Sequence, residues 1–523
     1  MTILGTSLIG AQRAEPSTAT FFAINPATNQ PLEPVFYAAT AQDVDQAAHL
    51  AESAFAEFGR TSGAQRSRLL RRIATLIREN AETLAERAHL ETGLPMARMQ
   101  GELGRTTGQL DLFAKVAEEG HWVDARIDRA QPDRKPLPKS DLRSMLRPLG
   151  PIGVFSASNF PFAFSVAGGD TASALAAGCP VIVKAHPGHP GTSELTAQLI
   201  QQALADCNLP AGVFSLLLDN TYAVGQALVK HPLVKAIGFT GSTRGGRALM
   251  DAAAARPVPI PVFAEMGSVN PVFLLPKALA LGADSLAAGL FASVTLGVGQ
   301  FCTNPGVVFV ADGPGRETFL AKLAELTKAA IPGVMLTPTL CTAYADGVNT
   351  RSALPGVQVL ACATSTETES PAAVGIPQIG LVGLADFLAC PELHEEIFGP
   401  YTLIVTCPSA AEFTCAARGL PGQLTATVHA VDGELAEFCD LLAAVESMAG
   451  RIVINGFPTG VEVCPAMHHG GPYPATSDGR SSSVGTRAIQ RFARPVCYQD
   501  FPDTCLPEAL QEANPLGLAR MEA

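Results

Sequence analysis

Charged and aromatic side chains are scarce in this chain of 523 residues. Asp, Glu, Lys and Arg make up 16% of it, Phe, Tyr and Trp make up 6%, and there is one tryptophan. Apolar residues reach 47%, so the chain buries enough apolar surface to fold, which excludes a largely disordered protein. Basic residues number 36 against 48 acidic ones, for a net charge of −12. Nucleic-acid binding requires a basic face, so we expect no nucleic-acid partner.

No two of the twelve cysteines are spaced as C-x-x-C, so neither a zinc ribbon nor a thioredoxin-like motif is expected, and we predict no metal site. Reduced thiols in the cytoplasm are the simplest interpretation for a chain of this length. The N-terminus lacks the positive region of a signal peptide. The stretch 154–183 is apolar enough to suggest a membrane span, but its prolines and glycines fit a buried strand–loop–helix–strand passage better. We therefore expect no membrane association.

Three helices are predicted before residue 120, over 40–59, 62–92 and 96–119. Thr40 and Asp43 form a capping pair for the first, and apolar residues follow at helical spacing. Ser62 caps the second segment, and Gly93 follows it as a typical helix end.

The segment 123–147 changes character, with many charges, three prolines and few large apolar residues. An exposed arm and a plain surface loop both fit this composition. From residue 150 onward, apolar runs of strand length alternate with helical segments, and a second alternating block runs from 273 to 454. This alternation predicts an α/β protein with parallel sheets and helices on both faces. The first four predicted strands are 152–156, 181–184, 214–218 and 236–239.

The segment 238–246 has the sequence GFTGSTRGG and lies between a predicted strand and a helical run over 247–255. Glycines let a backbone approach a phosphate, and the start of a helix offers free N–H groups. The pattern differs from G-x-G-x-x-G. A dinucleotide site and a tight strand–helix turn without a ligand both fit it.

Cys302 lies in the segment 299–306, GQFCTNPG, where glycine and proline on both sides leave little bulk over the sulfur. A nucleophilic thiol needs access and a lowered pKa. Most cysteines are inert core residues, and this turn distinguishes Cys302 from the other eleven.

Two further polar residues stand in apolar surroundings. Glu265 follows the run 257–263 and either faces solvent or is buried, and burial would raise its pKa and make it a general base near neutral pH. Asn159 either caps a turn or donates a hydrogen bond to an oxyanion. In the segment 395–400, EEIFGP, the two acids alone would indicate a solvated face.

Together, these motifs resemble the aldehyde dehydrogenase superfamily. The family series is an N-P/F-P segment with the amide, a lysine after the next strand, F-T-G-S-T, E-x-G-x-x-x-P, G-Q-x-C and E-E-I-F-G-P. The resemblance covers nearly the whole chain. In this sequence the series begins, in the family order, at Asn159, Lys184, Phe239, Glu265, Gly299 and Glu395.

The resemblance implies a fold of two Rossmann-like parallel-sheet domains with an oligomerisation arm, assembled as a homodimer or homotetramer. The cofactor-binding domain would comprise 1–122 and 148–264, and the catalytic domain 265–455. Segments 123–147 and 480–502 would form the arm and the C-terminal tail.

The resemblance also implies residue roles. Cys302 would attack a small-molecule aldehyde, the Asn159 amide would hold the oxyanion, and Glu265 would activate the water that hydrolyses the thioester. The residues implied for a nicotinamide cofactor are Lys184 with His186 as an added donor, Gly241, Ser242, Glu396 and Phe398.

The resemblance gives an expectation for cofactor preference as well. NAD-preferring relatives often carry a glutamate three residues after the lysine, where it repels the 2′-phosphate of NADP. Pro187 stands at that position here. We expect NADP to be preferred and NAD to be accepted.

The C-terminal third departs from the common family pattern. The usual P-F-G-G-x-K-x-S-G is replaced by HHGGPYPAT over 468–476. This stretch and the segment 184–193 are similar to the α-ketoglutarate semialdehyde (2,5-dioxovalerate) dehydrogenases, which implies oxidation of that semialdehyde to 2-oxoglutarate. The NADP-dependent fatty aldehyde dehydrogenases have similar features and remain the alternative.

A CoA-dependent reaction and a loss of catalysis are both disfavoured. CoA-acylating relatives usually lack the glutamate base, so Glu265 argues against that reaction. A protein that kept the fold and lost catalysis is disfavoured because Asn159, Glu265, Cys302 and Glu396 are all present. The sequence assigns no residue to the distal carboxylate of a semialdehyde acid.

Overall fold

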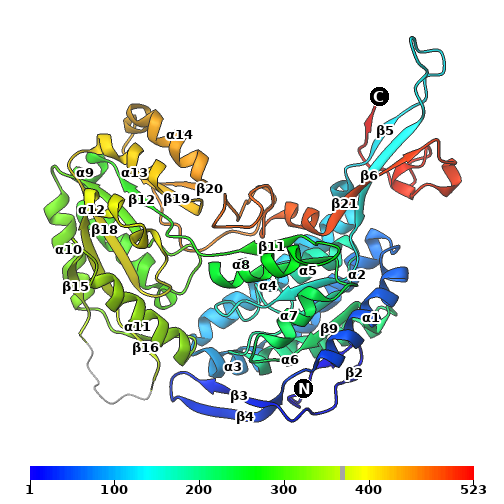
Figure 1. Cartoon of the computed structure of the whole chain (residues 1–523), viewed down its shortest axis with the longest axis horizontal. Coiled ribbons are helices and arrows are strands. Elements are labelled where there is room, and N and C mark those ends of the chain that lie inside the picture. The colour runs from blue at the N-terminus through cyan, green and yellow to red at the C-terminus, as the bar shows by residue number, and fades with distance from the viewer. Residues whose placement is uncertain (365–371) are drawn as a thin grey trace.

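The computed structural model describes residues 1–364 and 372–523. Two seven-stranded sheets, each flanked by helices, form two lobes (Figure 1). This is the predicted α/β architecture.

The first sheet has the strand order β11-β10-β7-β8-β9-β1-β2. Its strands are β1 (Leu8–Ile9), β2 (Gln12–Arg13), β7 (Ile152–Phe155), β8 (Val181–Lys184), β9 (Phe214–Leu217), β10 (Ala236–Thr240) and β11 (Val262–Glu265). The five strands from β7 to β11 are parallel, as predicted, and the four predicted strands are found within one residue of their expected bounds.

The first sheet also has an antiparallel edge that the sequence pattern did not indicate, because β1 runs antiparallel to β9 and to β2. A two-residue connection with Gly10 at φ 57° joins β1 to β2. Such a short turn joins only antiparallel strands, because a parallel pair needs a long crossover.

Helices cover both faces of this sheet (Figure 1). They are α1 (Ala41–Phe58), α2 (Gly63–Glu79), α3 (Ala81–Thr92), α4 (Met96–Glu119), α5 (Gly169–Ala177), α6 (Pro190–Asp206), α7 (Ala223–Lys230) and α8 (Thr243–Ala254). Thr40 and Asp43 form the predicted capping box of α1, and α4 has the predicted bounds.

The prediction of a single helix over 62–92 was wrong, because the helix is interrupted at Asn80, between α2 and α3. The side-chain amide of Asn80 donates a hydrogen bond of 2.8 Å to the carbonyl of Leu76, and its backbone leaves the helical region at φ −116° and ψ 18°. Asparagine competes for helix carbonyls in this way and favours helix ends.

The second sheet has the order β15-β17-β18-β13-β12-β19-β20, and β15 is its one antiparallel strand. The strands are β12 (Val272–Leu274), β13 (Val307–Ala311), β15 (Gln358–Cys362), β17 (Gln378–Gly383), β18 (Tyr401–Cys407), β19 (Gln423–His429) and β20 (Ala449–Ile454). Its helices are α9 (Pro276–Thr295), α10 (Arg316–Lys328), α11 (Pro338–Ser352), α12 (Leu384–Ala389), α13 (Phe413–Gly419) and α14 (Cys439–Met448).

Among the described residues, one helical stretch, 276–299, is long and apolar enough by composition to cross a membrane. It comprises α9 and the short helix η3 (Leu296–Gly299). Leu279, Leu290 and Val294 of α9 pack in the core against strands of the second sheet. A core helix of a globular protein has the same composition.

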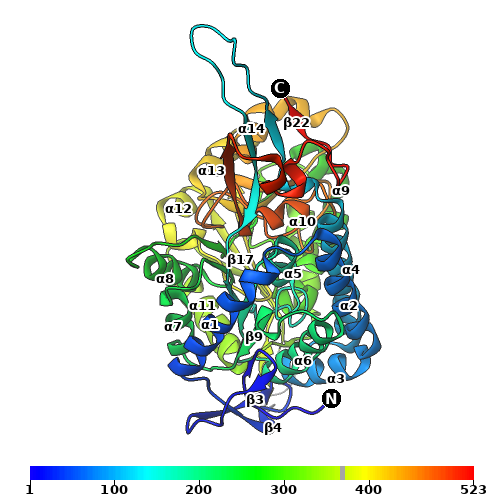
Figure 2. The same cartoon turned by 90° about the vertical axis from the view of Figure 1, so that its right-hand side faces the viewer.

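A four-stranded sheet of order β21-β6-β5-β22 projects from the first lobe. Its strands are β5 (Arg126–Asp128), β6 (Leu142–Pro148), β21 (Ala493–Gln499) and β22 (Met521–Glu522). The β5–β6 hairpin covers most of the segment 123–147 expected as an arm or a loop, ends one residue beyond it at Pro148, and extends away from both lobes (Figures 1 and 2). The short helix η7 (Thr486–Phe492) packs on α5 instead, with Phe492 in the core of the first lobe. The proposed domain limits and a role of the arm between subunits stay predictions.

Two small antiparallel pairs complete the described strands. β3 (Thr20–Asn25) pairs with β4 (Gln30–Tyr37), and β14 (Gly333–Val334) pairs with β16 (Val374–Gly375).

Candidate active site

The carboxyl ends of neighbouring parallel strands gather several of the predicted site residues. In the first sheet, Lys184 pairs in register with Phe155 of β7, and Glu265 pairs with Thr240 of β10. Asn159 follows β7, and the turn with Gly241 follows β10. Ligand sites of open parallel sheets lie at this edge, because the loops after the strands open there.

Cys302 lies just after α9 and η3, where the backbone is unusual. Gly297, Val298 and Gly299 all have positive φ. A Cβ on Gly299 would lie 2.2 Å from the carbonyl oxygen of Gly399, so only glycine allows this close approach. The turn thereby holds the thiol segment against the segment that contains Glu396.

A histidine that the sequence motifs did not single out links Cys302 to Glu265. Nδ1 of His469 lies 2.7 Å from Oε2 of Glu265, and Nε2 of the same ring lies 3.6 Å from Sγ of Cys302. His469 is 3% exposed and Glu265 is 4% exposed. An ionised carboxylate only accepts hydrogen bonds, so Nδ1–H donates to Glu265 and the lone pair of Nε2 faces the thiol. A nucleophile, a base and a group that orients the base are arranged in this way in cysteine and serine hydrolases.

Serine side chains hold this group in place. The Ser483 hydroxyl donates a hydrogen bond to Oε2 of Glu265, and the backbone N–H of His469 donates to the Ser482 hydroxyl at 3.0 Å. The second carboxylate oxygen, Oε1, is buried and has no hydrogen-bond partner among the described residues. Glu265 therefore retains one unpaired acceptor inside the site.

The expectation that burial raises the pKa of Glu265 was wrong in its net effect. Burial does push the pKa of this carboxyl up, but the contact with His469 and the hydrogen bonds from His469 and Ser483 lower the pKa below its ordinary value. Glu265 is therefore ionised at neutral pH, and it is a weaker base than burial alone would make it.

The lowered thiol pKa expected for Cys302 was also wrong. Burial raises its pKa well above the ordinary value, and the negative charges of Glu265 and Glu396 raise it further, against smaller opposing effects of Arg105 and Arg451. The resting sulfur is a neutral thiol that needs a base to accept its proton.

Asn159 lies beside the nucleophile segment. Its side-chain nitrogen Nδ2 donates a hydrogen bond of 3.1 Å to the backbone carbonyl of Gln300, two residues before Cys302. Arg98 donates a hydrogen bond of 2.8 Å to the backbone carbonyl of Asn159. The amide is 6% exposed, and because NH₂ carries two hydrogens, one remains to serve a substrate oxygen.

Lys184 and His186 form a group at the end of β8. Nζ of Lys184 donates a hydrogen bond of 2.9 Å to the carbonyl of Asp219, and burial lowers the lysine pKa to about 8. Nδ1 of His186 accepts the N–H of Gly188 at 3.1 Å, and burial lowers the pKa of His186 well below its ordinary value. His186 is therefore neutral, and its hydrogen is on Nε2. The group offers one cation and one neutral donor.

The turn after β10 lies at the surface, and the backbone N–H of its Gly241 donates a hydrogen bond of 3.0 Å to the carbonyl of Glu265. Gly241, Ser242 and Arg244 are exposed, and the Ser242 hydroxyl caps α8 by accepting the N–H of Gly245 at 3.2 Å. The free N–H groups at the start of a twelve-residue helix suit a phosphate.

Glu396 and Phe398 line a small crevice with Ser268, Gly299 and Asn304, next to the nucleophile turn. Burial raises the pKa of Glu396 to about 8, against a hydrogen bond from the backbone N–H of Ser268 that lowers it. Glu396 is half-buried and forms no ion pair with a cation among the described residues, and such a carboxyl is suited to binding ligand hydroxyl groups.

The structure thus brings Cys302 and Glu265 together through His469, places the Asn159 amide on the backbone of the nucleophile segment, and places Glu396 within electrostatic range of the thiol. Lys184 and His186, and separately Gly241 and Ser242, lie in two further groups along the same sheet edge. Sequence reasoning missed His469 and Ser483. The only signal for His469 was the replacement of the usual family pattern by HHGG at 468–471.

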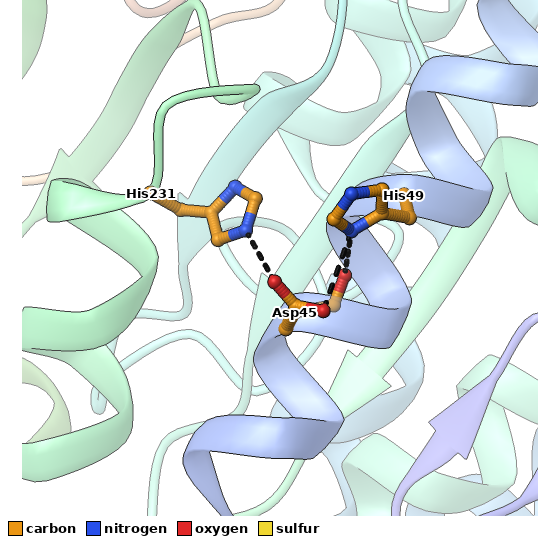
Figure 3. A group of neighbouring side chains, drawn as sticks. All are labelled: Asp45, His49 and His231. Atoms are coloured by element: carbon orange, nitrogen blue, oxygen red, sulfur yellow. Dashed lines mark hydrogen bonds and ion pairs between the residues drawn. The ribbon is translucent and has the colours of Figure 1, made fainter.

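A second group of titratable side chains lies on the surface, away from this site (Figure 3). Asp45 and His49 of α1 meet His231, with His231 Nε2 at 3.3 Å from Oδ1 of Asp45. His231 Nδ1 accepts the N–H of Leu233 at 3.3 Å, so Nε2 carries the hydrogen and turns it toward Asp45. The lone pairs therefore do not converge on one point, and the group joins α1 to the segment after α7.

Comparison with known proteins gives a consistent result. The family described as "Aldehyde dehydrogenase family" matches residues 13–342. "Alpha-ketoglutaric semialdehyde dehydrogenase 2" of Azospirillum brasilense is 51% identical over 100% of this chain and 99% of its own length. "Alpha-ketoglutaric semialdehyde dehydrogenase" of Acinetobacter baylyi is 44% identical over 99% of this chain and 98% of its own. A solved structure of 3,6-anhydro-L-galactose dehydrogenase, in complex with NAP, superposes with a TM-score of 0.81 at 22% identity, covering 94% of this chain and 99% of that one.

Proposed function

The chain belongs to the aldehyde dehydrogenase family, and from this premise we propose that it oxidises α-ketoglutaric semialdehyde (2,5-dioxopentanoate) to 2-oxoglutarate. It is an oxidoreductase that acts on aldehydes. The observation that carries the substrate is the 51% and 44% identity, over essentially complete lengths, to two enzymes named for this reaction. The observation that supports the mechanism is the hydrogen-bonded series Cys302, His469 and Glu265.

The first step is attack of the Cys302 sulfur on the aldehyde carbon. The thiol proton passes to Nε2 of His469, which lies 3.6 Å away, and the new imidazolium is paired through Nδ1 with the ionised Glu265. The ion pair between the His469 imidazolium and Glu265 compensates for the raised thiol pKa. Because Glu265 neutralises the imidazolium, proton transfer leaves no unpaired positive charge in the buried site.

Attack turns the aldehyde oxygen of the substrate into an oxyanion. We assign the remaining N–H of the Asn159 amide and the backbone N–H of Cys302 as its donors. The hydrogen bond from Asn159 to the Gln300 carbonyl and the one from Arg98 to the Asn159 carbonyl fix the amide before substrate arrives. Donors that are oriented in advance stabilise the developing charge without reorganisation.

The enzyme uses a nicotinamide cofactor, and the described residues fit one. The exposed start of α8 with Gly241 and Ser242 fits the pyrophosphate, Lys184 with His186 fits the adenosine ribose, and the half-buried Glu396 beside Phe398 fits the nicotinamide ribose. The chemistry that the nicotinamide supplies when bound is acceptance of a hydride from the substrate carbon.

Hydrolysis of the Cys302 thioester completes the reaction. We assign Glu265 as the residue that accepts a proton from the attacking water, because its Oε1 is buried, ionised and without a partner among the described residues. Its other oxygen keeps His469 oriented toward the sulfur. Water rather than CoA is then the acyl acceptor, and the product is a carboxylate.

We propose NADP as the preferred cofactor and NAD as accepted. Pro187 supplies no carboxylate at the position where NAD-preferring relatives often have one. Asp219 is an acid that acts on Lys184, and its carboxylate is held by the N–H groups of Thr221 and Val224. The positive charge of Lys184 is therefore available to a 2′-phosphate.

We further propose a cytoplasmic homodimer or homotetramer. All twelve cysteines lie in the described residues, and none of them forms a disulfide, as expected in a reducing compartment. The four-stranded arm extends beyond the body of the monomer (Figure 2), where its strands can contact a second subunit.

A substrate panel tests the proposed activity. Initial rates are measured with α-ketoglutaric semialdehyde, succinic semialdehyde and a long-chain aldehyde, with the Cys302→Ala variant as the control for background turnover. We expect kcat/KM to be highest for the first substrate and the variant to be inactive while still binding cofactor. A higher kcat/KM for the long-chain aldehyde would contradict the assignment and favour a fatty aldehyde dehydrogenase.

A further inference from the structure

Arg105 combines a cationic side chain, unpaired buried donors and nearness to the nucleophile. It lies on α4, and its Nη1 donates a hydrogen bond to the backbone carbonyl of Val461. Its Nε and Nη2 are buried and have no hydrogen-bond partner among the described residues. Buried polar nitrogens that lack a partner are rare, because leaving them unpaired costs stability. The two nitrogens thus have the character of a site for an acceptor that comes from outside the chain.

Contacts place this guanidinium beside the catalytic group. Its central carbon lies 5.5 Å from the ring centre of Phe164, and that ring lies 6.4 Å from the ring of His469. The charge of Arg105 also interacts with Cys302 and Glu265, and such an interaction is stronger in the protein interior than in water. Arg105 therefore faces the same space as the sulfur that attacks the aldehyde.

A second arginine approaches from the other lobe. Arg451 of β20 donates hydrogen bonds to the carbonyls of Gly460, at 2.9 Å, and Pro458. Its Nε is buried and unpaired among the described residues, and its charge also acts on Cys302. Arg451 and Arg105 thus both bind the segment 458–461, and the Gly460 N–H donates to the hydroxyl of Thr303, the residue after the nucleophile.

The guanidinium of Arg105 is not paired with a neighbouring carboxylate of the described residues. It forms no ion pair within 4.0 Å with any carboxylate of the described residues. Glu102, one turn earlier on α4, accepts the backbone N–H groups of Phe162 and Ala163 at 2.8 and 3.0 Å. Glu462 is exposed. The positive charge is therefore available to an incoming anion.

We propose that Arg105 binds the distal carboxylate of the substrate through Nε and Nη2, with Arg451 as the second cation, and so selects semialdehyde acids over neutral aldehydes. This inference rests on the proposed function, because it concerns the far end of the aldehyde that Cys302 attacks. The planar guanidinium pairs two parallel N–H groups with two carboxylate oxygens, which a lysine ammonium cannot reproduce.

The same arrangement disfavours an alkyl chain. A long-chain aldehyde would cover the two buried nitrogens without offering an acceptor, and a site built for hydrogen bonds rejects an analogue that lacks them far more strongly than an apolar pocket rejects a changed methylene. Arg105 would therefore give the enzyme a preference for semialdehyde acids over the long-chain substrates of a fatty aldehyde dehydrogenase.

The test compares wild type with Arg105→Met, Arg105→Lys and the control Lys115→Met, which removes an exposed cation from the same helix. The measured quantity is the ratio of kcat/KM for α-ketoglutaric semialdehyde to kcat/KM for pentanal. The ratio decides, rather than either rate, because a shift of the segment 458–461 lowers both rates alike. The inhibition constant of glutarate, measured with pentanal as substrate, gives an independent reading of carboxylate binding.

We expect Arg105→Met to lower the ratio at least about 100-fold and to raise the glutarate inhibition constant by a similar factor. Arg105→Lys should retain part of the kcat/KM ratio and part of the affinity for glutarate, and Lys115→Met should match wild type in both. A ratio in Arg105→Met within threefold of wild type overturns the proposal, including the case where both rates fall together, since Arg105 would then only hold the loop.

The outcome separates this inference from the proposed function. If wild type prefers succinic semialdehyde to α-ketoglutaric semialdehyde, and Arg105→Met abolishes its preference for either acid over pentanal, the substrate assignment fails and the role of Arg105 stands. If wild type prefers α-ketoglutaric semialdehyde and Arg105→Met keeps that preference, the function stands and the role of Arg105 fails.

Discussion

Glu265 and His469 are 204 positions apart in the chain, yet Nδ1 of His469 donates a hydrogen bond of 2.7 Å to Oε2 of Glu265. This contact fixes which nitrogen of the ring carries hydrogen and turns the other nitrogen toward Cys302. It also lowers the pKa of a buried carboxyl that burial alone would raise. One hydrogen bond thus sets the state of the base and the orientation of the group that receives the thiol proton.

His469→Gln should slow the first turnover by about 10²–10⁴-fold at neutral pH, the usual contribution of a positioned base. Part of the rate should return at alkaline pH, because the thiol, whose pKa is raised by burial, then ionises without help. Rapid-mixing measurement of reduced cofactor across this pH range checks the prediction. His468→Gln, at the half-buried neighbouring position, is the matched control and should stay within a few-fold of wild type. An unchanged first turnover in His469→Gln would remove His469 from thiol activation.

Glu265→Gln should slow thioester hydrolysis more than hydride transfer. The amide oxygen of glutamine can still accept a hydrogen bond from Nδ1 of His469, so His469 can still accept the thiol proton. The amide cannot accept a proton from water. We expect a burst of reduced cofactor followed by a slow steady state in rapid-mixing kinetics. If the burst disappears and the first turnover itself is slow, Glu265 acts mainly through His469. A wild-type steady-state rate would exclude it from the mechanism.

Asn159→Ala should reduce turnover by about 10²–10³-fold, the scale for loss of one oxyanion donor. Substrate affinity should change less than kcat, because the oxyanion exists only after attack. Ser158→Ala, at the neighbouring half-buried position, is the control and should leave kcat near wild type. A loss below threefold in Asn159→Ala would show that the amide only holds the Gln300 carbonyl.

NADP binding should weaken as pH rises through about 8, because burial lowers the pKa of Lys184 to about 8. Below that pH the ammonium is charged and attracts the 2′-phosphate, and above it the attraction is lost. The dissociation constants of NADP and NAD, measured by titration calorimetry on Cys302→Ala, should converge at alkaline pH. Lys184→Met should remove most of the NADP preference and flatten its pH dependence. A tenfold preference for NAD in wild type would show that another acidic side chain near the adenosine ribose repels the 2′-phosphate of NADP.

The amino-acid sequence determined much of the local structure. The predicted α4 has its expected bounds, and the first four parallel strands were located within one residue, because helical and strand periodicities act over a few positions. The edge pair β1–β2 and the break at Asn80 were missed, since a pairing partner or a single side-chain hydrogen bond decides each of them. The motif order also indicated the family, which the comparisons show.

Only the tertiary structure decided the state of the site. The pKa of Glu265 depends on how far it is removed from water and on a histidine 204 residues away. Nε and Nη2 of Arg105 are buried, without a hydrogen-bond partner among residues 1–364 and 372–523, where α4, the loop at Val461 and the ring of Phe164 meet. Desolvation and charge pairing act through space, and no local pattern in the sequence records which distant segments the fold brings into contact.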